Sequence, residues 1–146
     1  MMDNREYKKV VNSSSEFFKN YCRSSYNDDW KLCLNWSSKW DIKDGRYWKK
    51  WMERLKTYIL GLGIGVSVFD SVYTTEFGGN GNLHLHSLIY VDNNINDVKS
   101  NVWKWCSNKG SVEIKLYDED LGFDYYMSKY LYVRNENNWG ILGLEI

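Results

Sequence analysis

The segment IGVSVFDSVYTTEFGGNGNLHLHSLIYV, residues 64–91, decides the fold that we expect for this chain. Its first half, residues 64–77, is dominated by β-branched and aromatic residues and shows no helical stripe, so it predicts a long strand. The Gly- and Asn-rich run at residues 78–82 predicts a turn, and LHLHSLIYV predicts the returning strand. The sequence therefore predicts an antiparallel β-hairpin over residues 64–91.

The segments around this hairpin predict helices packed against a mainly antiparallel sheet. Trp48, Trp51 and Leu55 recur at helical spacing after Gly45, and lysines cover the other face of the predicted helix, which is typical of an amphipathic helix. No repeat or linker divides the chain, so we expect a single α+β domain over residues 1–146. The other expected elements are a helix at 14–25, a strand at 30–37, a helix ending near 107, a strand at 111–117, a helix at about 119–133 and a closing strand within 138–146.

Composition limits the classes of function. The 19 Lys and Arg residues balance the 19 Asp and Glu residues, which excludes a strongly basic protein with histone-like affinity for nucleic acid. The 8 Trp and 12 Tyr residues supply rings that either stack on bases or fill the core. Three cysteines without a CxxC pair argue against a disulfide framework and a cysteine zinc site. We expect a reducing, cytoplasmic setting without a signal peptide or a membrane span.

The two histidines of the chain, His84 and His86, both lie on the predicted returning strand. Side chains two residues apart point to the same face of a strand, so the two imidazoles project together. Glu76 lies at the end of the neighbouring strand, and the glycine turn would bring its carboxylate beside them. Two imidazoles and one carboxylate leave open coordination positions, as a catalytic metal requires. In the alternative interpretation, both histidines are half-buried strand residues with hydrogen-bonded rings.

A second pattern lies in the segment DYYMSKYLYV near the C-terminus. Tyr126 and Lys129 are three residues apart and hence neighbours on one helical face, and Tyr130 follows one turn after Tyr126. A phenol with a pKa of about 10 is a poor nucleophile at neutral pH. A metal-polarised phosphate and an adjacent ammonium group make its attack on phosphorus feasible. The alternative interpretation is a tyrosine and a lysine on the surface of an amphipathic helix.

Together these motifs resemble those of the rolling-circle replication initiators, the small plasmid and viral Rep proteins of the HUH endonuclease superfamily. Their His-hydrophobic-His motif, preceded by an acidic residue and a glycine turn, is matched by the run from Glu76 to His86, and their YxxK motif by the run from Tyr126 to Lys129. The family's first motif is matched loosely by LCLNWSS at residues 32–38. The whole resemblance covers roughly residues 30–143.

Two further positions bear on this resemblance. Asn35 stands where many members have a threonine, and Asn138-Trp139-Gly140 is similar to an aromatic-glycine element of viral and phage members. The resemblance implies an RRM-like, ferredoxin-like sandwich and a site-specific nickase and strand transferase for single-stranded DNA. Tyr126 would become linked to the 5′ phosphate, with Tyr130 as the second choice of nucleophile. Lys129 would add a positive charge, and Mn²⁺ or Mg²⁺ would be held by Glu76, His84 and His86.

Several partners follow from this interpretation. The substrate would be a hairpin or single strand at a replication origin, and a homodimer would supply two tyrosines for successive nicking and joining. The sequence has no GxxxxGK[ST] loop, so unwinding and synthesis would depend on a host helicase and polymerase. DNA binding without net charge needs a local patch, and we expect rings at Trp36, Trp40 or Trp139 to stack on a base. The expected patch consists of Arg46, Lys49, Lys50, Arg54 and Lys56. An ordinary solvated helix face would explain these residues equally well.

Three other functions stay open at this point. A single-strand insertion-sequence transposase shares the histidine pair and the helical tyrosine, and it differs by cutting transposon ends instead of an origin hairpin. A mononuclear iron or zinc enzyme of β-barrel type also uses HxH and Glu, but it usually needs another histidine, which this sequence lacks. A protein on the same fold that binds DNA without cutting it is distinguished only by a measurement of activity.

Overall fold

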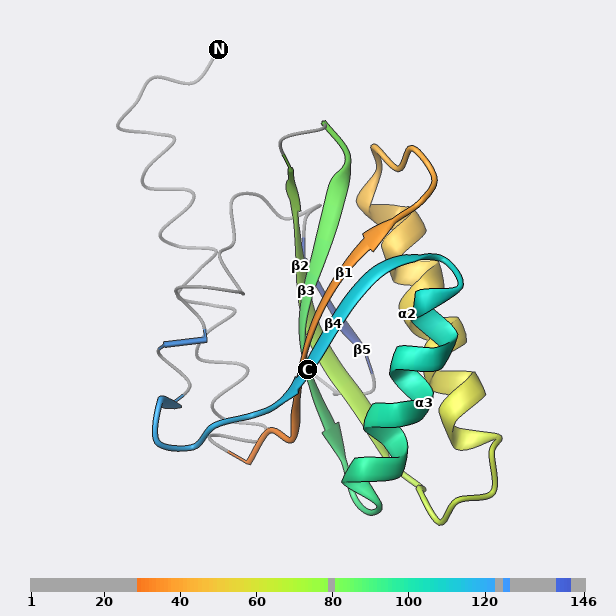
Figure 1. Cartoon of the computed structure of the whole chain (residues 1–146), viewed down its shortest axis with the longest axis vertical. Helices are drawn as coiled ribbons and strands as arrows, with labels where there is room; N and C mark the ends of the chain where they lie inside the picture. Colours follow the sequence, from red (N-terminus) through yellow and green to blue (C-terminus); the bar gives the residue numbers. More distant parts are fainter. Residues whose placement is uncertain (1–28, 79–80, 123–124, 127–138, 143–146) are drawn as a thin grey trace.

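The computed structural model describes residues 29–78, 81–122, 125–126 and 139–142. Within these residues the chain is an α+β protein in which two helices lie on one side of a five-stranded antiparallel sheet (Figure 1). The strand order is β4-β1-β3-β2-β5. The elements are β1 (Leu32–Ser38), α2 (Gly45–Leu60), β2 (Phe69–Phe77), β3 (Leu83–Val91), α3 (Ile95–Ser107), β4 (Gly110–Leu116) and β5 (Trp139–Leu142).

The predicted hairpin is confirmed and forms the centre of the sheet. β2 and β3 pair antiparallel, with Glu76 opposite His84 and Thr74 opposite His86. The turn closes where the N–H of Gly78 donates to the carbonyl of Asn82 at 2.9 Å. Because β3 also pairs with β1, it is hydrogen-bonded on both sides and its register is fixed twice.

The first strand of the hairpin is shorter than predicted, because β2 begins at Phe69 and not at residue 64. Gly65 has a φ of +81°, in the left-handed region that breaks an extended run. Ser67 and Val68 then donate their backbone N–H groups to the carboxylate of Asp92, each at 3.0 Å. The Asp92 side chain therefore accepts the backbone N–H groups that a longer β2 would have donated to a neighbouring strand.

This contact makes part of the stability dependent on pH. The backbone N–H of Val68 and the donors of Ser67 hold the pKa of the Asp92 carboxyl below its ordinary value of 3.8. A depressed folded-state pKa stabilises the fold above the unfolded pKa, and the gain is lost as pH falls through the folded value. We expect Asp92→Ala to lower the urea midpoint clearly at about pH 7 and much less at about pH 2. An equal loss at both values would contradict this prediction.

The main core lies between the sheet and the two helices. Residues that alternate along the strands point to this side, among them Leu34 and Trp36 of β1 and Leu85 of β3. α2 contributes its buried stripe of Trp48, Met52, Leu55 and Ile59, and α3 contributes Val98, Val102 and Cys106. We call this side of the sheet the helix face and the other side the histidine face.

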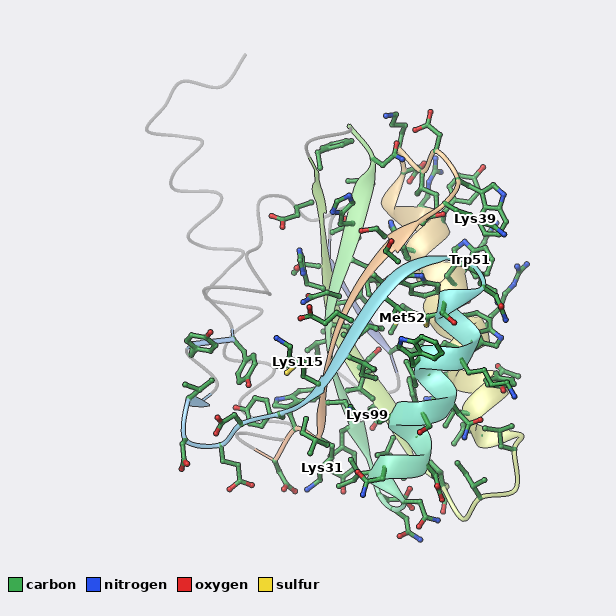
Figure 2. The ribbon with its side chains drawn as sticks, in the orientation of Figure 1. Lys31, Lys39, Trp51, Met52, Lys99 and Lys115 are labelled. Atoms are coloured by element: carbon green, nitrogen blue, oxygen red, sulfur yellow. The ribbon has the colours of Figure 1, made fainter. Side chains whose placement is uncertain are left out.

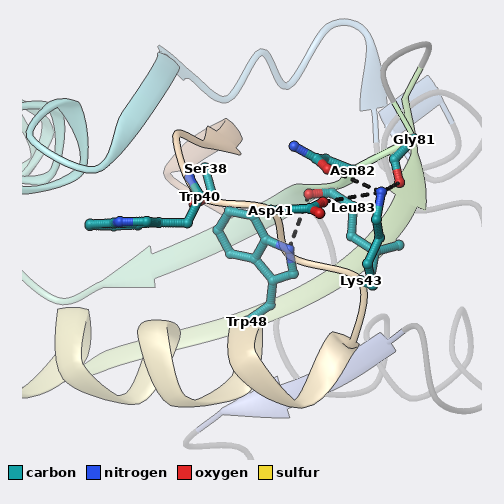
Figure 3. Close-up of polar contacts among 8 residues, drawn as sticks. All are labelled: Ser38, Trp40, Asp41, Lys43, Trp48, Gly81, Asn82 and Leu83. Atoms are coloured by element: carbon teal, nitrogen blue, oxygen red, sulfur yellow. Dashed lines mark hydrogen bonds and ion pairs between the residues drawn. The ribbon is translucent and has the colours of Figure 1, made fainter.

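The β1–α2 connection and the start of α2 hold the turn end of the hairpin (Figure 3). The ammonium of Lys43 donates to the Gly81 carbonyl at 2.7 Å and to the Asn82 side chain at 3.3 Å. The indole N–H of Trp48 donates to the Leu83 carbonyl at 3.2 Å. Since the same end of the hairpin carries Glu76, these bonds help to position the candidate site.

Most other predicted elements agree with the structure to within a few residues. The helix after Gly45, the strand at 30–37, the helix ending near 107, the strand at 111–117 and the closing strand are confirmed as α2, β1, α3, β4 and β5. The expected helix at 14–25 lies outside the described residues, and that at 119–133 is described only in part, with Tyr125 and Tyr126 helical. No helix in the described part of the chain is long and apolar enough to cross a membrane.

Candidate functional site

The candidate site lies on the histidine face, at the junction of the three central strands. On β3, Leu85 is fully buried on the helix face, so the flanking His84 and His86 point to the opposite face. The register places Glu76 of β2 and Asn35 of β1 beside them, Glu76 opposite His84 and Asn35 opposite His86. The sheet therefore brings two imidazoles, a carboxylate and an amide onto one surface.

His86 bridges the two neighbouring strands. Its Nε2 lies 2.7 Å from Oε1 of Glu76, and its Nδ1 lies 2.6 Å from Oδ1 of Asn35. Both ring nitrogens of His86 thus have an oxygen partner, with Asn35 behind Nδ1 and Glu76 in front of Nε2, and these two contacts fix the orientation of the ring. This is the arrangement that orients a metal-binding histidine, with a protein carbonyl behind it.

His84 packs against the turn of the hairpin. A Cβ atom added to Gly78 would lie 2.2 Å from Cε1 and 2.5 Å from Nε2 of His84, so only glycine leaves room for this ring. The Nε2 atom is buried and has no hydrogen-bond partner in the structure as described. A buried polar atom without a partner is costly, and His84 Nε2 shares this property with Trp36 Nε1 and Ser71 Oγ among the described residues. Of these three atoms, only the imidazole nitrogen is a common metal ligand.

The structure brings together only part of the predicted metal set. Glu76 and His86 are in direct contact, but no three His, Cys, Asp or Glu side chains among the described residues form a group that could hold a metal ion. The donors nevertheless suit such an ion chemically, because two imidazole nitrogens and a carboxylate oxygen are a ligand set for manganese. An ion at this place would also give His84 Nε2 the partner that it lacks.

The predicted nucleophile lies on the same face but is held in a closed position. The Tyr126 side chain is only 5% exposed, and its hydroxyl accepts a hydrogen bond from the Asp118 N–H at 3.0 Å. The thiol of Cys33 on β1 is a second hydrogen-bond partner. Burial raises the pKa of Tyr126 above its ordinary value and that of the Cys33 thiol to about 12. In this position the phenol is protonated at neutral pH.

A small cavity lies beside Tyr126 and Asn35 on the histidine face. It has a volume of about 130 Å³ and is lined by Asn35 and Tyr126, with Cys33, Glu113, Lys115, Leu121 and Tyr125 around them. Asn35 thus contacts His86 on one side and lines this cavity on the other. Lys115 and Glu113 form an ion pair at 3.1 Å beside it. The predicted Lys129 and Tyr130 lie outside the described residues.

The predicted DNA-binding patch on α2 lies on the opposite side of the sheet. Figure 2 shows Trp51 of this helix on the helix face, with Lys115 on the other side. Arg46 is paired with Asp44 at 2.6 Å and Lys56 with Asp70 at 3.5 Å. Exposed positions on α2 are held by Lys49, Lys50 and Arg54.

The base-stacking predictions have different outcomes. Trp36 is only 2% exposed and packs against Trp48, so the prediction that Trp36 stacks on a base is wrong. The reason is that alternation along β1 turns this ring into the core. Trp40 is 47% exposed and stays available. Trp139 begins β5, and its side chain lies outside what the structure describes.

Two residues of the site were not predicted as such. Asn35 was noted only as a departure from a family motif, although its place between the buried Leu34 and Trp36 already turns it away from the core. Gly78 was interpreted only as part of a turn, and no pattern in the sequence announces its contact with the His84 ring. Comparisons of the chain with models of known families, with curated proteins and with solved structures give no match. Fold and site alone therefore define an α+β protein with a Glu-His-Asn cluster on the histidine face of its sheet.

Proposed function

We propose that this protein is a metal-dependent nickase and strand transferase for single-stranded DNA, of the HUH endonuclease class. The observation that carries the proposal is the position of Glu76, His84 and His86 on adjacent strands, with Tyr126 on the same face beside Asn35. The connectivity supports it as well. The element order β1-α2-β2-β3-α3-β4 and the strand order β4-β1-β3-β2 are compatible with the split βαβ arrangement that we propose, with β5 as an added edge strand.

In the proposed reaction the Tyr126 hydroxyl attacks the phosphorus of the scissile phosphodiester. The phenol loses its proton, the bond from phosphorus to the 3′ oxygen breaks, and that oxygen gains a proton. The products are a 5′-phosphotyrosyl link and a free 3′ hydroxyl, which can prime synthesis or reverse the reaction on a new strand. Because one phosphoester replaces another, the chemistry needs no nucleoside triphosphate.

The histidine site would hold the divalent ion, Mn²⁺ or Mg²⁺. When bound, such an ion supplies charge neutralisation at the non-bridging oxygens and orients the phosphate. Glu76, His84 and His86 would be its protein ligands, with Asn35 fixing the His86 ring from behind. Lys129 would add a point charge near the phosphate, and Tyr130 is the second choice of nucleophile.

The proposed biological role is initiation of rolling-circle replication at an origin hairpin in the cytoplasm of a host cell. A homodimer would provide a second tyrosine, and a host helicase and polymerase would unwind and extend the strand. Transposition of a single-strand insertion sequence uses the same chemistry on a different DNA end. The two are distinguished by whether origin hairpins or transposon ends are cut.

Covalent trapping tests the proposal directly. Purified protein is incubated with Mn²⁺ and labelled single-stranded oligonucleotides that span candidate hairpins, and the mixture is separated under denaturing conditions. We expect a denaturant-resistant adduct that disappears when EDTA removes the metal. Metal bound at the histidines without an adduct on any hairpin or single strand would overturn the proposed nickase.

The buried hydroxyl of Tyr126 favours one other candidate function. A protein that kept this closed position when bound to DNA would bind single strands without cutting them. The same trapping experiment separates the two functions. Stable binding without an adduct supports the non-cleaving protein, and an adduct excludes it.

Asn35 provides a finer test of the metal site. Asn35→Ala removes the acceptor at Nδ1 of His86 and leaves every proposed metal ligand in place. We expect Mn²⁺ affinity to fall by roughly 10- to 100-fold, as for other partners that orient a metal-binding histidine. Calorimetric titration with Mn²⁺ measures the change, and Asn35→Asp, which keeps an acceptor, serves as the control. Unchanged affinity in Asn35→Ala would contradict the orienting role.

A further inference from the structure

The helix face carries a second surface with the chemistry of a nucleic-acid site. Four aromatic rings meet where the β1–α2 connection, α2 and α3 come together. Trp40 stacks on Trp51 with ring centroids 5.7 Å apart and planes 15° apart, and Tyr58 stacks on Trp105 at 6.0 Å and 26°. Trp51 joins the two stacks by an edge contact with Trp105 at 5.7 Å. We call this the tryptophan surface.

Cations lie over these rings. The ammonium of Lys39 is 4.7 Å from the Trp40 centroid, and that of Lys109 is 3.8 Å from the Trp105 centroid. The guanidinium of Arg54 is 5.6 Å from the Trp51 centroid. Figure 2 shows Lys39 and Trp51 on the side of the sheet that the helices cover. Positive charge and flat apolar area therefore alternate across one surface.

These cations, like Lys49, Lys99 and Lys104, take no part in the ion pairs that join described residues. Lys31, Lys43, Arg46, Lys56 and Lys115 each pair with an aspartate or glutamate. By contrast, no carboxylate in the described part of the chain lies within ion-pair distance of the cations on the tryptophan surface, Lys39, Lys50, Arg54 and Lys109. Among the described residues these four cations are therefore not held in ion pairs, while the carboxylate of Glu53 lines the groove beside Lys50 and Arg54.

A groove runs beside the rings. It has a volume of about 450 Å³ and is lined by Lys50, Arg54, Tyr58 and Trp105, with Glu53 and Thr57 completing it. Outside the groove, burial lowers the pKa of Lys109, with the charge of Lys39 acting in the same direction and Cys106 opposing it. An anion near Lys39 and Lys109 would offset the repulsion between them.

From these observations we infer that the tryptophan surface binds single-stranded DNA, with a base stacked on Trp40 and the adjoining phosphates on Lys39, Lys50, Arg54 and Lys109. Stacking platforms interleaved with cations are the usual means of holding single strands without reading their sequence. A base on Trp40 takes the place of the Lys39 ammonium and frees that cation for the next phosphate. The choice of DNA rests on the proposed function; the choice of a single strand rests on the exposed ring.

The inference gives the protein two DNA contacts on opposite sides of its sheet. The histidine face would cut one segment of the strand, and the tryptophan surface would hold another. The strand leaving the first site would pass around the edge of the sheet to reach the second. This arrangement would keep the two ends of a cut strand on one molecule without any net positive charge on the chain.

Binding is measured with the full chain in EDTA, so that no cleavage occurs, using fluorescence anisotropy of labelled oligothymidylate of about 20 nucleotides. We expect Trp40→Ala to weaken binding by about 5- to 100-fold and Trp40→Phe to retain most of the affinity. Trp103→Ala is the matched control, since Trp103 is also exposed, at 53%, but lies over no cation in the part of the chain described here.

Salt dependence tests the phosphate contacts. We expect Lys39→Ala and Arg54→Ala each to reduce the slope of log affinity against log salt by about 0.7, the value for one phosphate contact on a single strand. Lys31→Ala is the control, because its side chain is paired with Asp29 at 2.9 Å and lies outside both the tryptophan surface and the patch predicted on α2. Equal effects of Trp40→Ala and Trp103→Ala, or of Arg54→Ala and Lys31→Ala, would overturn the inference.

The outcome is separable from that of the proposed nickase. If DNA binding depends on Trp40 but no adduct forms, the tryptophan surface is supported and the proposed nickase is contradicted. If an adduct forms but Trp40→Ala does not weaken DNA binding, the nickase is supported and the tryptophan surface is contradicted. Circular dichroism of each variant verifies that it is folded before its affinity is compared.

Discussion

Tyr126→Phe is expected to abolish the covalent adduct while leaving binding of the oligonucleotide intact. The substitution removes one oxygen atom, the atom proposed to attack phosphorus, and keeps the ring that packs against Tyr117 at 4.7 Å between centroids. The expected loss is complete, because no other atom of this side chain can form the phosphoester. Denaturing electrophoresis of the mixture with labelled DNA and Mn²⁺ measures it.

The same substitution has a structural cost that must be separated from the chemical one. Tyr126 accepts a hydrogen bond from the Asp118 N–H, which Tyr126→Phe leaves without that partner. We expect a loss of about 1 kcal/mol in the free energy of unfolding, too little to unfold the protein. Tyr125→Phe is the matched control, since Tyr125 lies edge-on to Tyr126 and belongs to the same segment. An adduct of normal yield in Tyr126→Phe would contradict the assignment.

The Tyr126 side chain must leave its closed position before its hydroxyl can react with DNA. Burial raises the pKa of this phenol, and the contacts with Asp118 and Cys33 hold it against β1. Attack on phosphorus requires that the hydroxyl leave these partners for the phosphate. We therefore expect adduct formation in Cys33→Ala to be at least as fast as in the native chain, because that variant loses one contact that holds the hydroxyl in place.

The sequence predicted the hairpin well because two independent signals coincide there. The period of two along LHLHSLIYV decides which side chains are buried, and burial of Leu85 leaves a single register in which Glu76 faces His84. A slip of one residue would bury both histidines and expose the leucines. The predicted grouping of residues on one face therefore followed from alternation alone.

The rest of the site depends on packing that no local pattern encodes. The contact of the His84 ring with Gly78 arises because a turn folds back over a strand. The stretch before β2 has a high strand propensity, but the Asp92 carboxylate, distant in sequence, takes its donors. The burial of Tyr126 likewise depends on contacts with Asp118 and β1. Long-range competition for hydrogen bonds overrides local propensity at each of these places.

His84→Leu and His86→Leu are expected to have different effects on the free energy of unfolding of the metal-free protein. His84→Leu removes a buried nitrogen that has no partner among the described residues, so the metal-free protein is expected to be as stable as the native chain or more stable by up to about 1 kcal/mol. His86→Leu breaks the bonds to Glu76 and Asn35 and is expected to cost about 1–2 kcal/mol. Urea unfolding in EDTA measures both.

Metal binding is expected to change in the same direction in both variants. Each loses a nitrogen ligand, so calorimetric titration with Mn²⁺ should show a loss larger than the roughly 10- to 100-fold predicted for Asn35→Ala. A purely structural histidine pair gives a different result, in which stability falls in both variants and Mn²⁺ has no effect on the native chain. If His84→Leu stabilises the metal-free fold and also abolishes Mn²⁺ binding, then metal binding explains why a histidine stands at this position.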